Sequence, residues 1–218
     1  MSENLKRTIS GIVYITLMWV GASYSSTSFA VLFGVLGIFC IYEMWKLRKG
    51  KTKLVAFIYV LLPFSLIQLF GITNHNYANE EFNPSIILLL FILTWTFDTF
   101  AYIFGVKFGK RKILPSISPK KSWEGFLGGF LFCFLAGFLS QYFFRSYFEN
   151  IPYKTIVILS LILPFTATLG DFIESHFKRQ AKVKDSGSIM PGHGGILDRM
   201  DAFMVTIPVL YLLINLVK

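Results

Sequence analysis

The sequence predicts an all-α membrane protein, a polytopic bundle of about seven transmembrane helices with a cytoplasmic N-terminus. Its 218 residues are 54% hydrophobic and only 15% charged, which is too apolar for an ordinary soluble domain of this length. The hydrophobic residues gather in runs close to the ~20 residues that cross a hydrocarbon core. The net charge of +9 comes from short basic clusters between these runs, as in cytoplasmic loops. This placement argues against nucleic acid, and we expect no such partner.

The hydrophobic runs follow one another without a repeat or linker, so we expect one domain over residues 1–218. It comprises N-terminal spans in 1–83 and a motif-bearing catalytic half in 84–218. No small-residue cleavage site follows the first run, so we interpret it as an uncleaved span. Pro63, Pro164 and Pro208 lie inside runs, where we expect kinks and not helix ends. The expected spans are residues 9–20, 28–45, 54–72, 84–106, 123–144, 155–175 and 198–217.

The distribution of positive charge sets the orientation. With the N-terminus inside, 18 of the 21 lysines and arginines fall on the cytoplasmic side. The other three are Arg145, Lys154 and Lys218.

Acidic residues of several runs then fall near the cytoplasmic face. Carboxylates inside a membrane are costly and usually face a cavity, so their convergence indicates a shared cation site, with oxygen ligands suited to Mg²⁺. Asp198 and Asp201 share a helical face. The alternative, which the sequence leaves open, is that the aspartates cap helices or pair with Arg199 and Lys178. The five acidic residues are Asp98, Asp171, Glu174, Asp198 and Asp201.

Two basic regions accompany these carboxylates. In residues 175–201, which we expect to form a loop, cationic side chains accompany glycines that let backbone approach a ligand. Ser118, Lys120 and Lys121 form a predicted Ser-Pro-Lys-Lys turn before a helix, where a triphosphate could dock. The alternative is that these cations only set topology. His193 is interpreted as a ligand-contacting or loop-ordering donor, with a purely structural role equally open. The cations of residues 175–201 are Lys178, Arg179, Lys182, Lys184 and Arg199.

These stretches resemble the phosphatidate cytidylyltransferases, also called CDP-diacylglycerol synthases. The resemblance covers residues 98–218, and the N-terminal third is similar only in being hydrophobic. Met190 and Ser122 are mild departures from the family pattern. The chain is also shorter than typical bacterial members by one or two N-terminal helices, which leaves the helix count and a homodimer open. The signature residues are Ser175, Lys178, Arg179, Lys184, Asp185, Gly187, Pro191, His193, Gly194, Gly195, Asp198, Arg199 and Asp201.

The resemblance implies transfer of CMP from CTP to phosphatidate, giving CDP-diacylglycerol and pyrophosphate in phospholipid biosynthesis. It implies a multi-pass protein of the inner cell membrane that takes its lipid from the cytoplasmic leaflet. Mg²⁺ would be held by Asp171, Asp198 and Asp201, with a second cation left open. The expected catalytic residues are these aspartates with Lys178 and Arg179. The expected substrate-binding residues are Ser118, Lys120, Lys121, Ser175, Lys184, Asp185, His193, Gly194, Gly195 and Arg199.

Two other classes of function fit parts of the pattern, a related CTP-using lipid enzyme and a membrane transporter. A CDP-archaeol synthase or polyprenol kinase shares the same phosphate chemistry. A transporter could also carry carboxylates inside its spans, but its polar groups should cross the membrane depth instead of gathering at one face.

The two basic regions are expected to divide the phosphates between them. Lys178 and Arg179 lie within two turns of Asp171, so we expect them near the metal and the reacting phosphates. Lys120 or Lys121 would then bind more remote charge on CTP or the lipid headgroup.

Overall fold

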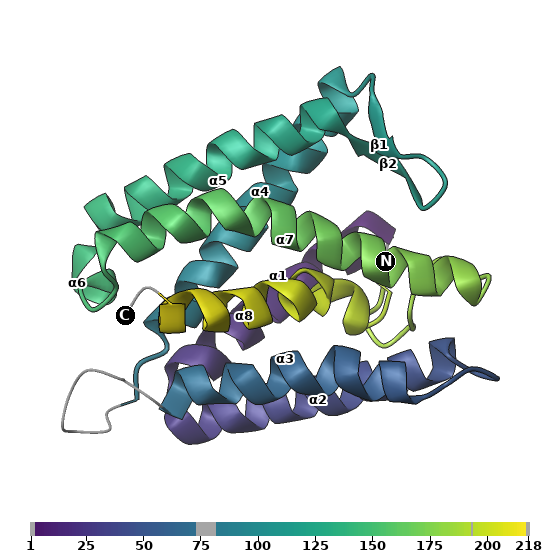
Figure 1. Ribbon diagram of the computed structural model, residues 1–218, viewed down its shortest axis with the longest axis horizontal. Helices are drawn as coiled ribbons and strands as arrows, with labels where there is room; N and C mark the ends of the chain where they lie inside the picture. The colour runs from purple at the N-terminus through teal and green to yellow at the C-terminus, as the bar shows by residue number, and fades with distance from the viewer. Residues whose placement is uncertain (1–2, 73–81, 193, 217–218) are drawn as a thin grey trace.

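Eight helices and one short hairpin make up the residues that the computed structural model describes, which are 3–72, 82–192 and 194–216 (Figure 1). The predicted all-α membrane class is confirmed, with one short β-hairpin in addition to the helices. The helices are α1 (Glu3–Ser23), α2 (Ser26–Leu47), α3 (Leu54–Ile72), α4 (Ser85–Phe108), α5 (Trp123–Phe143), α6 (Arg145–Phe148), α7 (Tyr153–Gln180) and α8 (Leu197–Leu216). The hairpin strands are β1 (Lys112–Leu114) and β2 (Ser118–Ser122).

Among the described residues, four helices are long and apolar enough to cross a membrane, namely α2, α4, α5 and α7. Shorter apolar segments lie in α1 and α3, at Thr8–Ser23 and Phe57–Gly71. The count of seven spans therefore stays a prediction. Pro63, Pro164 and Pro208 lie inside α3, α7 and α8, which confirms that they do not end helices.

The predicted loop over residues 175–201 is shorter than expected. Helix α7 continues through Gln180 and α8 begins at Leu197, so only residues 181–196 connect them. Lys178 and Arg179 consequently belong to the last turn of α7. Basic side chains are favourable there because the C-terminal end of a helix carries partial negative charge.

The predicted Ser-Pro-Lys-Lys turn is wrong in its local structure. Ser118 to Lys121 lie in β2, which pairs antiparallel with β1, and the turn falls at residues 115–117 instead. Pro115 suits that turn because its φ angle is already fixed. The Ser122 side chain then accepts a hydrogen bond from the Gly125 amide at 3.2 Å and caps α5.

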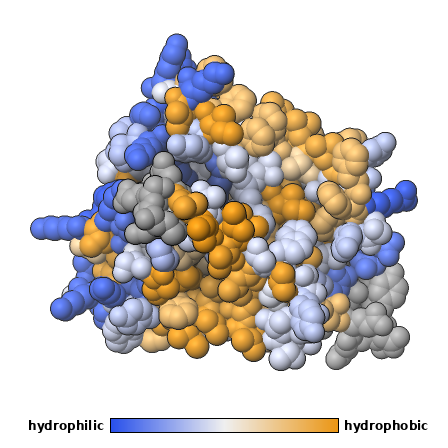
Figure 2. All heavy atoms as spheres, turned by 180° about the vertical axis from the view of Figure 1, so that it is seen from behind, coloured by the Kyte–Doolittle hydropathy of each residue, from blue (hydrophilic) through white to orange (hydrophobic). Residues whose placement is uncertain are grey.

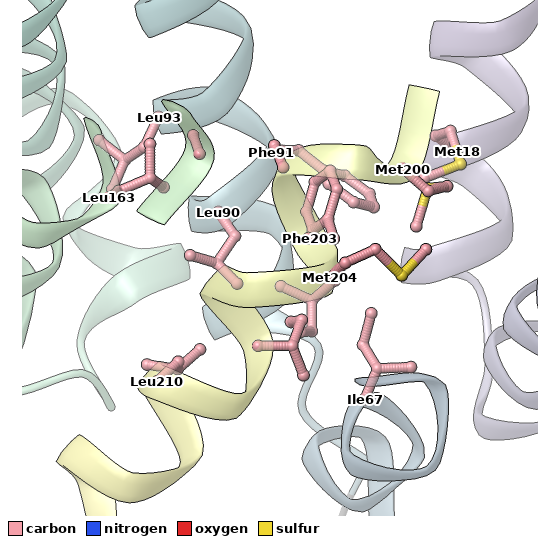
Figure 3. Close-up of a cluster of buried hydrophobic side chains, with 14 of the residues drawn as sticks. Met18, Ile67, Leu90, Phe91, Leu93, Leu163, Met200, Phe203, Met204 and Leu210 are labelled. Carbon is pink, nitrogen blue, oxygen red and sulfur yellow. The ribbon is translucent and has the colours of Figure 1, made fainter. Parts of the chain in front are cut away.

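Helices from both ends of the chain share one hydrophobic core. Figure 3 shows Leu90 and Phe91 of α4 against Phe203 and Met204 of α8. Met18 of α1 and Ile67 of α3 join the same cluster (Figure 3). This shared core brings the N-terminal helices against α8, whose N-terminal end carries Asp198, Arg199 and Asp201.

Close helix contact fixes α5 on α4. A Cβ atom at Gly125 would lie 2.7 Å from the Ala101 carbonyl oxygen and 3.0 Å from the Gly105 Cα. Only glycine permits this approach without moving the backbone. The close packing of α4 and α5 therefore fixes the positions of the two helix ends that the hairpin connects.

Polar and apolar surfaces separate along the molecule. Figure 2 shows a hydrophobic band across the middle, with many hydrophilic residues at the end that carries the hairpin. The connection between α2 and α3, the hairpin and the connection between α7 and α8 all lie at this end, while α6 lies at the other (Figure 1). The two predicted basic regions thus meet at one end of the bundle.

Candidate active site

A cavity of about 700 Å³ lies among α4, α5, α7, α8 and the hairpin. It joins residues that are far apart in the sequence, because its lining comes from both basic regions and from four of the five predicted acidic residues. The charged residues that line it are Asp98, Lys112, Lys120, Lys121, Asp171, Asp198, Arg199 and Asp201. The predicted convergence of carboxylates beside basic groups is therefore present in the fold.

Three carboxylates form the tightest acidic group. One oxygen from each of Asp171, Glu174 and Asp201 lies within 4.8 Å of the other two. The first two lie on α7 and the third on α8. Gly170 permits this meeting, because a Cβ there would lie 3.0 Å from the Asp201 carbonyl carbon. Such a set of hard oxygen ligands suits a small divalent cation.

Each basic region contributes one lysine to these carboxylates. Lys121 of β2 forms an ion pair with Asp171, and its ammonium lies 5.3 Å from the centre of the Phe172 ring. Lys178 of α7 pairs with the fully buried Glu174 and, at 2.7 Å, with Asp198 Oδ1. Charge pairing offsets part of the cost of placing these groups inside the protein.

Asp198 has a second role in the connection between α7 and α8. Its Oδ2 accepts hydrogen bonds from the Ser186 amide at 2.9 Å, the Ser186 hydroxyl at 2.9 Å and the Gly195 amide at 2.8 Å. Asp198 lines the cavity but lies outside the group of Asp171, Glu174 and Asp201. Its expected role as a metal ligand stays a prediction.

Glu43 is a residue that the sequence reasoning missed. It lies on α2 with 1% of its surface exposed, and it accepts hydrogen bonds from the Ser186 hydroxyl, the Ile196 amide and the Leu197 amide. The available signal was an acidic residue inside the otherwise uncharged run of residues 28–45.

The predicted division between the two basic regions differs from the structure. Lys121, expected at a distance, contacts Asp171, whereas Arg179 is exposed and donates to the Ile117 and Val183 carbonyls at 3.4 and 3.2 Å. Lys120 is also exposed, although it lines the cavity.

Five further predicted site residues do not line the cavity, namely Ser118, Ser175, Lys184, Asp185 and Gly194. The Ser175 hydroxyl donates to Asp171 Oδ1 at 3.0 Å, and Ser118 is half-buried in β2. Lys184 and Asp185 are exposed in the connection between α7 and α8. Gly194 has a φ of 85°, a region that favours glycine. His193 lies outside the described residues.

The sequence pattern of the Cytidylyltransferase family matches residues 47–217. The chain belongs to this family. It is 36% identical to a phosphatidate cytidylyltransferase of Rickettsia typhi over 212 residues, which cover 94% of this chain and 89% of that protein. A Rickettsia bellii protein of the same name is 34% identical over 210 residues, covering 94% and 88%.

Similarity is higher over a shorter region in other relatives. A phosphatidate cytidylyltransferase of Staphylococcus aureus (strain COL) is 48% identical over 128 residues, which cover 59% of this chain and 48% of that protein. The Rickettsia matches cover nearly the whole chain, so the likeness extends into the N-terminal spans, beyond the residues 98–218 on which the sequence resemblance rested.

Proposed function

We propose that this chain is a phosphatidate cytidylyltransferase, which transfers CMP from CTP to phosphatidate. The cavity that brings Lys121, Arg199 and the aspartates together, with Lys178 paired to Asp198 at its edge, is the observation that carries the proposal. Its mixture of carboxylates and ammonium groups suits a phosphate-rich substrate, and the chain is a member of the cytidylyltransferase family.

In the proposed reaction a phosphate oxygen of phosphatidate attacks the α-phosphorus of CTP. A new P–O bond forms there, while the bond to the bridging oxygen of the β-phosphate breaks and pyrophosphate leaves. A phosphate monoester has its second pKa at about 6 and is largely ionised at neutral pH, so the attack needs no base. The work of the protein is to orient the two phosphates and to neutralise charge that develops on the leaving group.

Magnesium is a proposed cofactor, and the carboxylates fit it. Asp171 and Asp201 belong both to the ligand set predicted from the sequence and to the close acidic group. When bound, Mg²⁺ would neutralise phosphate charge and favour departure of pyrophosphate. The two sets differ in their third member: the sequence predicts Asp198, whereas Glu174 completes the close acidic group. The Mg²⁺ concentration at half-maximal rate should rise in whichever of Asp198→Asn and Glu174→Gln removes a ligand.

We also propose the finer topology: seven spans in an inner cell membrane, an N-terminus in the cytoplasm, and a lipid substrate in the cytoplasmic leaflet. The gathering of basic connections at one end of the bundle supports it (Figures 1 and 2). Phosphatidate could then meet CTP without its acyl chains leaving the membrane. A homodimer stays a prediction from the family resemblance, for which light scattering of the detergent-purified protein is the test.

The reaction is tested with purified protein in detergent, CTP, Mg²⁺ and a choice of acceptor lipid. We expect pyrophosphate and CDP-diacylglycerol with phosphatidate, and no pyrophosphate without an acceptor. Transfer only to an unsaturated archaeal ether lipid would indicate a CDP-archaeol synthase. Phosphorylation of a polyprenol would indicate a kinase, and no CTP turnover with any of these lipids would overturn the proposal.

The topology is tested with single cysteines at Ser188 and Asn150, which are both exposed. The native Cys40 and Cys133 are buried and should label poorly with a membrane-impermeant thiol reagent. We expect the cysteine at 188 to label from the cytoplasmic side and the cysteine at 150 from the opposite side. Labelling of both from one side would contradict the seven-span topology.

A further inference from the structure

Glu43 connects the N-terminal helices to the segment that opens α8. Its carboxylate lies 2.8 Å from the Ser186 hydroxyl, 3.1 Å from the Ile196 amide and 2.9 Å from the Leu197 amide. Two of these donors are backbone N–H groups at the start of α8, which have no acceptor within their own helix. A negative group is also favourable at this positive end of the helix. Glu43 therefore fixes where α8 begins.

A continuous set of polar contacts runs from Glu43 to the cavity. Ser186 contacts both Glu43 and Asp198, through its hydroxyl at 2.8 and 2.9 Å. Asp198 in turn pairs with Lys178, which also pairs with Glu174 of the close acidic group. A shift of Glu43 would thus reach Asp198, which lines the cavity.

Two signature glycines leave the space that this carboxylate occupies. A Cβ atom at Gly187 would collide with Glu43 Oε1, and one at Gly195 would collide with both Ser186 Oγ and Glu43 Oε2. The carboxylate group of Glu43 also lies in a site with almost no exposure to solvent. Glycine at these two positions is therefore explained by close contact with Glu43.

We propose that Glu43 is a positioning residue for cytidylyl transfer, which holds residues 186–198 so that Asp198 and its neighbours face the cavity correctly. The inference rests on the proposed function for its kinetic part. It assigns a role in catalysis to a residue of α2, outside the motif-bearing half of the chain. Glu43 itself does not line the cavity, so its effect passes through Ser186 and Asp198.

The test compares Glu43→Gln with the wild-type protein by kinetics and by hydrogen–deuterium exchange. The amide keeps the size of the side chain but places an N–H₂ group where one oxygen accepts hydrogen bonds. We expect kcat to fall by about 10- to 100-fold, as for removal of other groups that orient a site, while the KM for phosphatidate changes by less than about twofold. Exchange in peptides covering 186–197 should rise by about tenfold through loss of hydrogen bonds.

Glu43→Asp and Glu149→Gln provide the matched controls. Asp keeps the charge on a shorter side chain, and we expect it to recover part of kcat. Glu149 is exposed beside α6 at the other end of the bundle, so the same chemical change there should alter neither measurement. If Glu43→Gln does not fold, Ser186→Ala removes the hydroxyl that joins Glu43 to Asp198 and should give the same two changes.

Three results overturn the inference: unchanged kcat, unchanged exchange at 186–197, or a loss of activity that only parallels loss of folded protein. The exchange measurement does not depend on the reaction. Wild-type protein that makes no CDP-diacylglycerol would therefore overturn the proposed function, while exchange would still decide whether Glu43 fixes the segment.

Discussion

The hairpin and the end of α7 each carry two neighbouring cations, and in both regions only one of the two meets a carboxylate. Lys121 pairs with Asp171 while Lys120 is exposed, and Lys178 pairs with Glu174 and Asp198 while Arg179 is exposed. The two cations of each neighbouring pair therefore differ in their contacts, whereas the two regions resemble each other.

Backbone geometry explains this division. Successive side chains of a strand point to opposite faces, which fits the ion pair of Lys121, but not Lys120, with Asp171, although both lysines line the cavity. On α7, Lys178 lies four residues after Glu174 and shares its face, whereas Arg179 is turned by about 100° around the helix axis. Distance along the chain from Asp171 was therefore a poor guide to which cation contacts the carboxylates.

Replacing Asp171, which is contacted by Lys121 of the hairpin and by Ser175 of α7, should lower kcat more than any other substitution. Asp171→Asn replaces the carboxylate of a proposed metal ligand by a neutral amide and also removes the partner of Lys121. We expect kcat to fall by about 10³-fold, since a metal ion contributes several kcal/mol to stabilising transition-state charge. Steady-state kinetics at saturating Mg²⁺ measure this, with Glu149→Gln as the control for an exposed carboxylate. Near-normal turnover would contradict the placement of the site.

The hairpin pair gives the next largest contrast. Lys121→Ala removes an ammonium group at the carboxylates, and we expect kcat to fall by about 100-fold, as for loss of one donor to developing charge. Lys120→Ala removes an exposed charge, and we expect a change in KM for CTP of about two- to fivefold. Equal kinetics in the two variants would show that the strand geometry does not separate their roles.

The sequence correctly predicted the features that depend on hydrophobic periodicity or on charged motifs. Hydrophobic runs located α2, α4, α5 and α7 to within a few residues, and the acidic and basic motifs pointed to residues that line one cavity. It missed the hairpin, because β1 and β2 are too short for a clear alternation of polar and apolar residues. It also missed Glu43, because the partners of Glu43 lie more than 140 residues away along the chain.

The close contact between α4 and α5 next to the hairpin should not tolerate a larger side chain at Gly125. Gly125→Ala would press a methyl group onto the Ala101 carbonyl and Gly105, so α4 and α5 would have to separate. We expect a loss of about 1–3 kcal/mol of stability, measured as a lower Tm in detergent, from overpacking. The matched control is Gly34→Ala on α2, where a Cβ atom would meet nothing within 4 Å. A Tm for Gly125→Ala as high as for Gly34→Ala would mean that the two helices pack less closely than described.

The smallest effect is expected for Arg179, the cation of α7 that faces away from the carboxylates. Its guanidinium donates only to the backbone carbonyls of Ile117 and Val183 among its described contacts, and both bonds are longer than 3.1 Å and exposed. Exposed contacts of this kind contribute little, so Arg179→Ala should change kcat and both KM values by less than about threefold.

Lys178→Met is the comparison for Arg179→Ala, because it removes the neighbouring cation and leaves Glu174 and Asp198 without that partner. Its expected loss in kcat is about 100-fold, comparable to Lys121→Ala. A tenfold or larger fall in kcat for Arg179→Ala, with KM unchanged, would show that Arg179 turns toward the phosphates when substrate is bound. In that case the sequence-based placement of Arg179 at the reacting centre would be restored, and the division within the α7 pair would hold only for the protein without substrate.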